Sequence, residues 1–276
     1  MQRMVQKVKH LLRAITLLIL WVSGFALFYF KKNKTKYGYC VRVITYHQVK
    51  DYQVKAFQKN LALFARTCNV LTPQDFLQKN FSKDKLNILI TFDDGYASWI
   101  TNVLPYMQKY SMKGIYFIPS GFINAGEQGG VFYASKRLSI KKVAPLTWAE
   151  LRSVFAGETI GGHTVSHPVF ASLSKEEIEN ELQEDKKTIE AVLQKQIDFF
   201  AYPFGDSVRV PSWCYDIPAK VGYKFAFTTI PGFANLASEQ FSIHRDCLEP
   251  DFSPLLTKAW VFGGYDIFRR IKNYLR

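Results

Sequence analysis

LNILITFDDGY (residues 86–96) begins as a buried strand and ends beside two adjacent carboxylates. Four of its first five residues are apolar, which is typical of a strand covered on both faces. Asp93 and Asp94 follow where this strand is expected to end. Burying a polar group without a partner costs on the order of 2–7 kcal/mol, and a lone carboxylate costs more. The stretch therefore requires a positive group near its end.

Strand-like runs alternate with helical patterns from residue 40 onward. Strands are expected at residues 40–47, 86–92, 113–119, 158–163, 198–203, 223–229 and 241–245. Helices are expected at residues 56–65, 97–110, 147–155, 174–194, 216–221 and 251–260, and a capping box starts the fourth. Residues 121–142, with scattered glycines and lysines, are expected to form a surface loop. The alternation predicts a parallel α/β architecture.

Histidines gather at the predicted strand ends. Four of the five lie there: His47, His163, His167 and His244. The two aspartates and the turn AYPFG (201–205) lie at strand ends too. Reactive groups of parallel α/β folds collect where strands end and loops begin, so these residues are expected to share one edge of the sheet.

These residue types suit a divalent metal. His163 and His167 are four residues apart, and two histidines with one carboxylate form a common metal-binding set. The second aspartate can then stay ionised and accept a proton from water, whose pKa a metal lowers from about 16 toward 7. A His-x-x-x-His pair or an Asp-Asp-Gly turn alone is more often structural. The prediction of a metal site therefore rests on the occurrence of both motifs at strand ends.

The three motifs together resemble a known family. TFDDGY (91–96), HTVSHP (163–168) and AYPFG (201–205) are similar to motifs of polysaccharide deacetylases with a NodB-homology domain, carbohydrate esterase family four. The resemblance covers about residues 40–250 and implies a distorted (β/α) barrel that removes N-acetyl groups from extracellular glycans. It implies Asp93 as general base and a backbone N–H donor at Phe204 for the oxyanion. It also implies a divalent metal, usually zinc, on three ligands: Asp94, His163 and His167.

Two departures from the family pattern bear on the mechanism. Many members have an arginine, oriented toward the base, where this chain has Ala201, so base activation is expected to differ here. Many supply the general acid from a late histidine, which would be His244. His47, in ITYHQV, instead resembles the branch that deacetylates biofilm poly-N-acetylglucosamine, in which a Tyr-His motif precedes the Asp-Asp-Gly motif. We favour His47 as the acid and keep His244 as the alternative.

The N-terminus is expected to anchor the protein. Ala14 to Phe30 contains no charged residue, and four basic residues lie on each side of it, with no acid before residue 37. We expect residues 1–36 to be a basic tail with one transmembrane helix, and residues 37–276 to be an extracellular deacetylase domain. A signal peptide cleaved after Ala26, giving a secreted protein, is the alternative.

Charge and composition limit the classes of binding partner that the sequence indicates. The rest of the chain has 28 basic and 23 acidic residues, an excess too small to indicate a nucleic-acid partner. Residues 259–276 are expected to form a basic amphipathic segment that rests on the membrane or covers the barrel. Protein partners cannot be deduced, and the four cysteines are expected to be free, although disulfides stay open.

The predicted reaction is metal-dependent hydrolysis of N-acetyl groups on an N-acetylglucosamine polysaccharide. Poly-N-acetylglucosamine of the biofilm matrix is the leading substrate, and peptidoglycan is the runner-up. An O-acetyl esterase would have the same metal site. A catalytically silent glycan-binding protein would have no need of the base Asp93.

Overall fold

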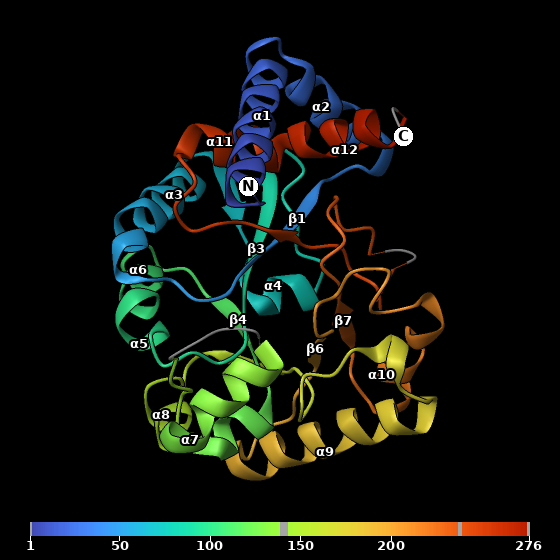
Figure 1. Cartoon of the computed structure of the whole chain (residues 1–276). Helices are drawn as coiled ribbons and strands as arrows, with labels where there is room; N and C mark the ends of the chain where they lie inside the picture. The colour runs from blue at the N-terminus through green and yellow to red at the C-terminus, as the bar shows by residue number, and fades with distance from the viewer. Residues whose placement is uncertain (1, 139–142, 237–238, 275–276) are drawn as a thin grey trace.

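A curled sheet of parallel strands forms the centre of the protein (Figure 1). The computed structural model describes residues 2–138, 143–236 and 239–274. Within them, the sheet has the order β7-β6-β5-β4-β3-β1-β8, and β2 pairs separately with β3. Its strands are β1 (Val41–Tyr46), β2 (Cys68–Val70), β3 (Leu86–Asp93), β4 (Gly114–Ile118), β5 (Thr159–Gly162), β6 (Phe199–Ala201), β7 (Phe225–Phe227) and β8 (Asp246–Cys247). The predicted parallel α/β architecture is confirmed.

Helices surround the outer face of this sheet (Figure 1). Those that follow strands along the chain are α3 (Val54–Thr67), α5 (Trp99–Asn102), α6 (Leu104–Lys109), α7 (Ser120–Tyr133), α8 (Trp148–Ser153), α9 (Lys175–Leu193) and α10 (Ile217–Lys220). The short helix α4 (Pro73–Leu77) lies within the curl of the sheet instead, where Phe76 is buried (Figure 1). At one end of the molecule, α1 (Gln2–Val22) and α2 (Phe25–Tyr37) gather with α11 (Pro254–Ala259) and α12 (Tyr265–Tyr274). The expected capping box of α9 is present, because Ser174 accepts from the Glu177 backbone and Glu177 accepts from the Ser174 backbone.

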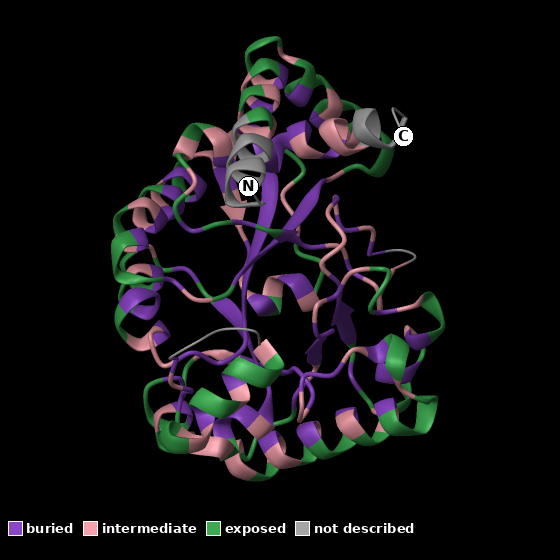
Figure 2. Ribbon diagram, in the orientation of Figure 1, coloured by how far each residue is buried: buried purple, intermediate pink, exposed green. Residues whose placement is uncertain are grey.

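Alternation along the strands divides the core into an inner and an outer part. The strands β1, β3 and β4 are buried along their whole length (Figure 2). Val43, Leu89 and Phe117 belong to the inner cluster, which Phe76 of α4 also joins. Ile44 and Ile90 belong to the outer cluster beneath the helices. Successive side chains of a strand point to opposite faces, so Asp93 shares the inner face with Leu89.

One short segment brings the two edges of the curled sheet together. Ile243 forms a parallel bridge with Phe227 of β7, and Asp246 and Cys247 pair with Ile44 and Thr45 of β1. Ile243 belongs to the inner cluster, so alternation turns His244 outward and Arg245 inward. The predicted strand 241–245 is therefore displaced toward residues 243–247.

The N-terminal segment packs on the rest of the protein. Leu17 and Phe30 belong to the outer core cluster, and rings of Trp21 and Phe262 lie 5.8 Å apart. In the described residues no single helix is long and apolar enough to cross a bilayer. Residues 12–22 and 25–37 meet that test only as a pair bent by 68°. The predicted transmembrane helix is thus not confirmed, and the domain boundary at residue 36 stays a prediction.

Two other predictions need correction. The loop expected at residues 121–142 is instead α7 and a π-helical turn, Ala134–Leu138, while residues 139–142 lie outside the described part. Phe122 and Ile123 are buried and hold α7 in place despite Gly126, whose φ of 62° interrupts the helix. The helix expected at residues 97–110 is broken at Val103 into α5 and α6.

All four cysteines are free, and three of them are buried.

Candidate active site

Six of the seven predicted site residues line one small cavity at the carboxyl ends of the strands. The cavity has a volume of about 130 Å³ and is lined by His47, Asp93, Asp94, Leu138, His163, His167, Phe204 and Thr229. Sites that enclose a whole drug-sized ligand usually measure about 300–1,000 Å³. This one accommodates a small group at the end of a larger substrate, whose remainder would lie across the mouth.

Asp94 lies between the two histidines. Its Oδ1 is 3.5 Å from Nε2 of His163 and 3.7 Å from Nε2 of His167. Its Oδ2 accepts a hydrogen bond of 2.7 Å from the Tyr96 hydroxyl. Burial opposes ionisation of Asp94, but hydrogen bonding to His163 and nearby positive charge outweigh it, so its pKa is lowered. The Asp94 φ of 86° belongs to the turn that aims this side chain away from β3.

His163 is oriented for ligation by a backbone contact. Its Nδ1 lies 2.6 Å from the carbonyl oxygen of Ala201, which can only accept, so Nδ1 carries a proton. Nε2 points toward Asp94 and becomes a metal ligand once its own proton is lost. Its backbone N–H donates to Asp185 of α9, a carboxylate that also accepts from the Ser120 N–H. Burial raises the pKa of Asp185 to about 6. These contacts fix the β5 end of the site.

His167 is held mainly by packing. Its ring meets Phe204 edge-on, with 4.7 Å between centroids, and its backbone N–H donates to Oγ1 of Thr164. Its Nδ1 is buried and has no hydrogen-bond partner in the described part of the chain. Burial, together with the charge of His163, lowers the pKa of His167 to about 4, which favours the neutral form that a metal requires.

The arrangement of the three side chains fits a cation with tetrahedral coordination. Ligand atoms of Asp94, His163 and His167 all lie within 4.8 Å of one another. Zinc bonds of about 2.0–2.1 Å place tetrahedral ligand atoms about 3.4 Å apart, close to the two distances from Asp94. One carboxylate and two imidazoles leave further coordination positions for water and substrate. The residues therefore suit a divalent ion such as Zn²⁺.

Asp93 is paired with an arginine that the sequence did not indicate. Nη1 and Nη2 of Arg245 each lie 2.7 Å from an oxygen of Asp93, a bidentate contact between two buried side chains. Nε of Arg245 donates to the Thr228 carbonyl, and Nη1 approaches Thr91 Oγ1 at 3.2 Å. Burial opposes ionisation of Asp93, but Arg245 outweighs it and lowers the pKa. Arg245 therefore supplies the positive charge missing at Ala201.

The remaining predicted residues fall into two groups. His47 follows β1 and lines the cavity, with its carbonyl accepting from Trp99 Nε1. Phe204 lines it from the turn after β6, at a φ of 62°. His244 does not reach the cavity: it faces the outer side and lines a separate pocket with Tyr29, Glu239 and others. Leu138 and Thr229, which sequence reasoning missed, complete the lining.

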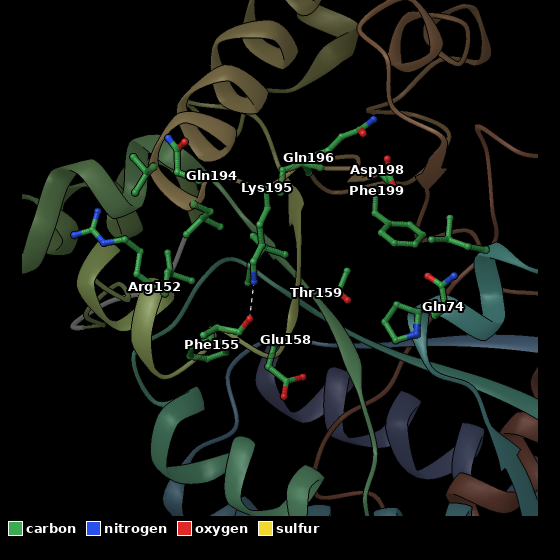
Figure 3. Close-up of a pocket in the computed structure, with 18 residues that line it drawn as sticks. Gln74, Arg152, Phe155, Glu158, Thr159, Gln194, Lys195, Gln196, Asp198 and Phe199 are labelled. Carbon is green, nitrogen blue, oxygen red and sulfur yellow. Dashed lines mark hydrogen bonds between the residues drawn. The ribbon is translucent and has the colours of Figure 1, made fainter.

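A larger cavity, of about 490 Å³, lies elsewhere (Figure 3). Thr159 and Phe199, among the residues that line it, stand at the amino ends of β5 and β6, opposite the strand ends that carry the aspartates. None of the predicted site residues lines it. The larger cavity is therefore separate from the candidate active site.

Known proteins resemble this chain in sequence and fold. A profile of the family described as polysaccharide deacetylase matches residues 81–225. YxkH of Bacillus subtilis (strain 168), whose own assignment as a polysaccharide deacetylase is provisional, is 26% identical over 198 residues. The match takes in 71% of this chain and 62% of YxkH, so the chain spans less than two thirds of that relative's length.

Three solved structures have a similar fold. The Streptococcus pyogenes deacetylase PplD in complex with acetate has a TM-score of 0.66 at 21% identity, over 80% of this chain and 98% of that one. IcaB from Ammonifex degensii has a TM-score of 0.63 at 19% identity, over 81% and 97%. A de-N-acetylase from Aggregatibacter actinomycetemcomitans has a TM-score of 0.61 at 15% identity, over 77% and 96%.

Proposed function

The chain belongs to the polysaccharide deacetylase family, and we propose that it hydrolyses N-acetyl groups on an N-acetylglucosamine polysaccharide outside the cell. The observation that carries the proposal is the convergence of Asp94, His163 and His167 next to Asp93 in one cavity. A glycan-binding protein needs no buried base beside such a cluster. The small volume of the cavity suits an acetamido group, with the polymer lying outside it.

Three ligands and one base divide the chemistry. Asp94, His163 and His167 would hold the cation, which we expect to be Zn²⁺. When bound, such an ion polarises an amide carbonyl and makes water more acidic. Asp93, kept ionised by Arg245, accepts a proton from the attacking water while the water oxygen bonds to the acetyl carbon.

Collapse of the resulting tetrahedral species breaks the C–N bond and needs an acid. We assign this role to His47, which lines the cavity and whose imidazole can protonate the leaving amine. His244 lines a different pocket, which supports this choice. The backbone N–H of Phe204 is the proposed donor to the developing oxyanion, because Phe204 lies in the turn beside His167. The products are acetate and a free amine on the sugar.

The leading substrate is poly-N-acetylglucosamine of the biofilm matrix. Support comes from the Tyr-His pair at residues 46–47, because its histidine lines the cavity as the resemblance to that branch implies. Deacetylation would give the polymer positive charge and favour its adhesion to anionic surfaces. Such polymers lie outside the cytoplasm, so we propose an extracellular catalytic domain held at the cell membrane by the N-terminal segment. Secretion after signal cleavage is the alternative.

Acetate release from defined substrates tests the proposal. The metal-loaded protein is expected to release acetate from 1,6-linked N-acetylglucosamine oligomers faster than from 1,4-linked oligomers or peptidoglycan fragments. Preference for the 1,4-linked substrates would identify a peptidoglycan-type deacetylase. Release from O-acetylated glycans alone would identify an esterase, and binding without release would identify a silent lectin-like protein. Asp93→Asn is the matched inactive control.

A further inference from the structure

Helix α1 carries apolar side chains on two faces. One face is buried against the protein, with Leu17 at 1% and Leu20 at 8% exposure. The other face is 45–81% exposed and bears Leu12, Ile15, Ile19 and Val22. Their spacing of three and four residues places them in one stripe along the helix. A helix on a globular protein normally has a single apolar stripe, facing the core. The outer stripe therefore requires a second apolar environment.

Exposed apolar side chains also occur at the start of α2. Gly24, with a φ of 79°, turns the chain between the two helices, which meet at 68°. Just past this bend, Phe25 is 59% exposed and Phe28 is 64% exposed. The exposed side chains of α1 and α2 named so far form what we call the outer apolar face: Leu12, Ile15, Ile19, Val22, Phe25 and Phe28.

The opposite face of the helix pair is fitted to the protein. A Cβ on Gly263 would lie 2.6 Å from the Tyr29 ring, so the glycine permits close approach of α2. Phe30 meets the Phe262 ring edge-on at 5.3 Å, and Ala26 is completely buried. If the helices left to cross a bilayer, the surface around Phe262 would be exposed to water. The fit thus favours helices that stay on the protein.

Charge indicates what covers the outer apolar face. Eight basic residues and no acidic residue precede residue 37. Among them, Lys31, Lys32 and Lys36 are exposed on α2. A second copy of the chain would bring like charges together, whereas an anionic lipid surface complements them. An apolar face bordered by lysines is typical of helices that lie in a membrane interface.

We propose that α1 and α2 lie in the plane of an anionic bilayer, with the outer apolar face immersed in one leaflet and the opposite face still packed on the protein. The helix pair then attaches the enzyme without crossing the membrane. The inference is independent of the proposed substrate, since it rests on the N-terminal helices alone.

Vesicle flotation tests the attachment with the full-length protein. The protein is expected to float with vesicles of phosphatidylglycerol and phosphatidylcholine in equal parts, and to bind at least about tenfold more weakly to phosphatidylcholine alone or in high salt. Replacing two exposed side chains by Ile19→Ser and Val22→Ser should weaken binding to the mixed vesicles at least about tenfold.

A matched variant controls for the loss of apolar surface. Val154 and Val208 are 44% and 80% exposed. Val154 directly follows α8 and Val208 lies in the loop after β6, both away from α1 (Figure 1). Val154→Ser with Val208→Ser should bind vesicles as the unmodified protein does. Both double variants should unfold at the temperature of the unmodified protein and release acetate from soluble oligomers at its rate. Equal vesicle binding by the two, or a change only in oligomeric state for the Ile19 and Val22 variant, overturns the proposal.

Labelling in protoplasts distinguishes in-plane attachment from crossing. With Cys247→Ser as background, Gln2→Cys and Tyr52→Cys are treated with a membrane-impermeant maleimide before and after lysis. Tyr52 is 72% exposed on the folded domain. The two positions should label together, since both lie on one side of the membrane. Labelling of only one before lysis means that the segment crosses and overturns the proposal. If both label only after lysis, attachment is in-plane but the extracellular location is wrong.

Discussion

Arg245 and Asp246 are neighbours in the chain, but they belong to different ion pairs on opposite faces of the sheet. Arg245 points inward and binds both oxygens of Asp93. Asp246 points outward, where Nη1 of Arg42 lies 2.8 Å from Oδ2 and Trp260 donates to Oδ1. Arg42 also binds Asp266, which ties α12 to β1. A buried arginine–carboxylate pair thus occurs on each face of the sheet.

The difference between the two pairs lies in what borders them. Asp93 lines the cavity beside the candidate metal ligands, whereas Asp246 is completely buried among protein groups. A buried arginine–carboxylate pair alone therefore does not identify a catalytic base. The inner pair is expected to control proton transfer, and the outer pair is expected to hold the C-terminal helix.

Breaking the outer pair should give the largest change in stability. Arg42→Met leaves two buried carboxylates without their partner, which typically costs about 3–5 kcal/mol. Denaturant unfolding measures this loss, and acetate release per folded molecule should stay unchanged. Lys220→Met, which removes an exposed pair with Asp216, is the control and should cost less than about 1 kcal/mol. An Arg42→Met protein of normal stability would show that the outer pair does not hold the fold.

Breaking the inner pair should change the pH dependence of catalysis. Burial raises the pKa of Asp93, but Arg245, with smaller contributions from His163 and His47, keeps it below its ordinary value of 3.8. Arg245→Met removes the largest of these opposing effects, so the pKa should rise. Asp93 then becomes protonated at a higher pH, so the acid limb of the pH profile of kcat should shift to higher pH. The expected loss at pH 7 is about 10–100-fold, shrinking as the pH rises. An equal loss at every pH would indicate a merely structural role.

An effect on metal affinity is expected next to the base, at Asp94. Tyr96→Phe removes the hydroxyl that donates to Asp94, and such supporting contacts are typically worth about 10–100-fold in metal affinity. Competition with a chelator measures that affinity. Tyr202→Phe removes another buried hydroxyl, which donates to the Phe241 carbonyl, and should leave metal affinity unchanged. If both variants bind metal equally well, Tyr96 does not support the ligand.

Alternation explains what could be read from the sequence and what could not. Asp93, Asp94, His163 and His167 lie in contiguous motifs at strand ends, so local pattern was sufficient to group them. Residues 241–245 are also a predicted strand, but the sequence did not show its exact register. A shift of one residue exchanges the two faces of a strand. His244, the late histidine that the family resemblance implied as the alternative acid, therefore faces outward, while its neighbour Arg245 reaches the site.

Helix packing was predictable only where one apolar stripe was present. The capping box and periodicity of α9 gave its limits almost to the residue. Residues 120–138 are helical because Phe122 and Ile123 pack into the core. The several glycines of this segment favour a loop, so its composition did not indicate the helix. The segment Ala14 to Phe30 has no charged residue and apolar side chains all round, so the sequence did not show that one face packs on α11 and α12. Tertiary contacts made with distant residues decided these cases.

Metal content measured together with turnover in Asp93→Asn tests the central claim most directly. The claim assigns the cation to Asp94, His163 and His167 and the base to Asp93. The account predicts that Asp93→Asn binds one divalent ion per chain and releases acetate at least about 10³-fold more slowly, whereas His167→Ala loses the ion as well. Full activity of Asp93→Asn, or an equally complete loss of metal in both variants, would contradict it.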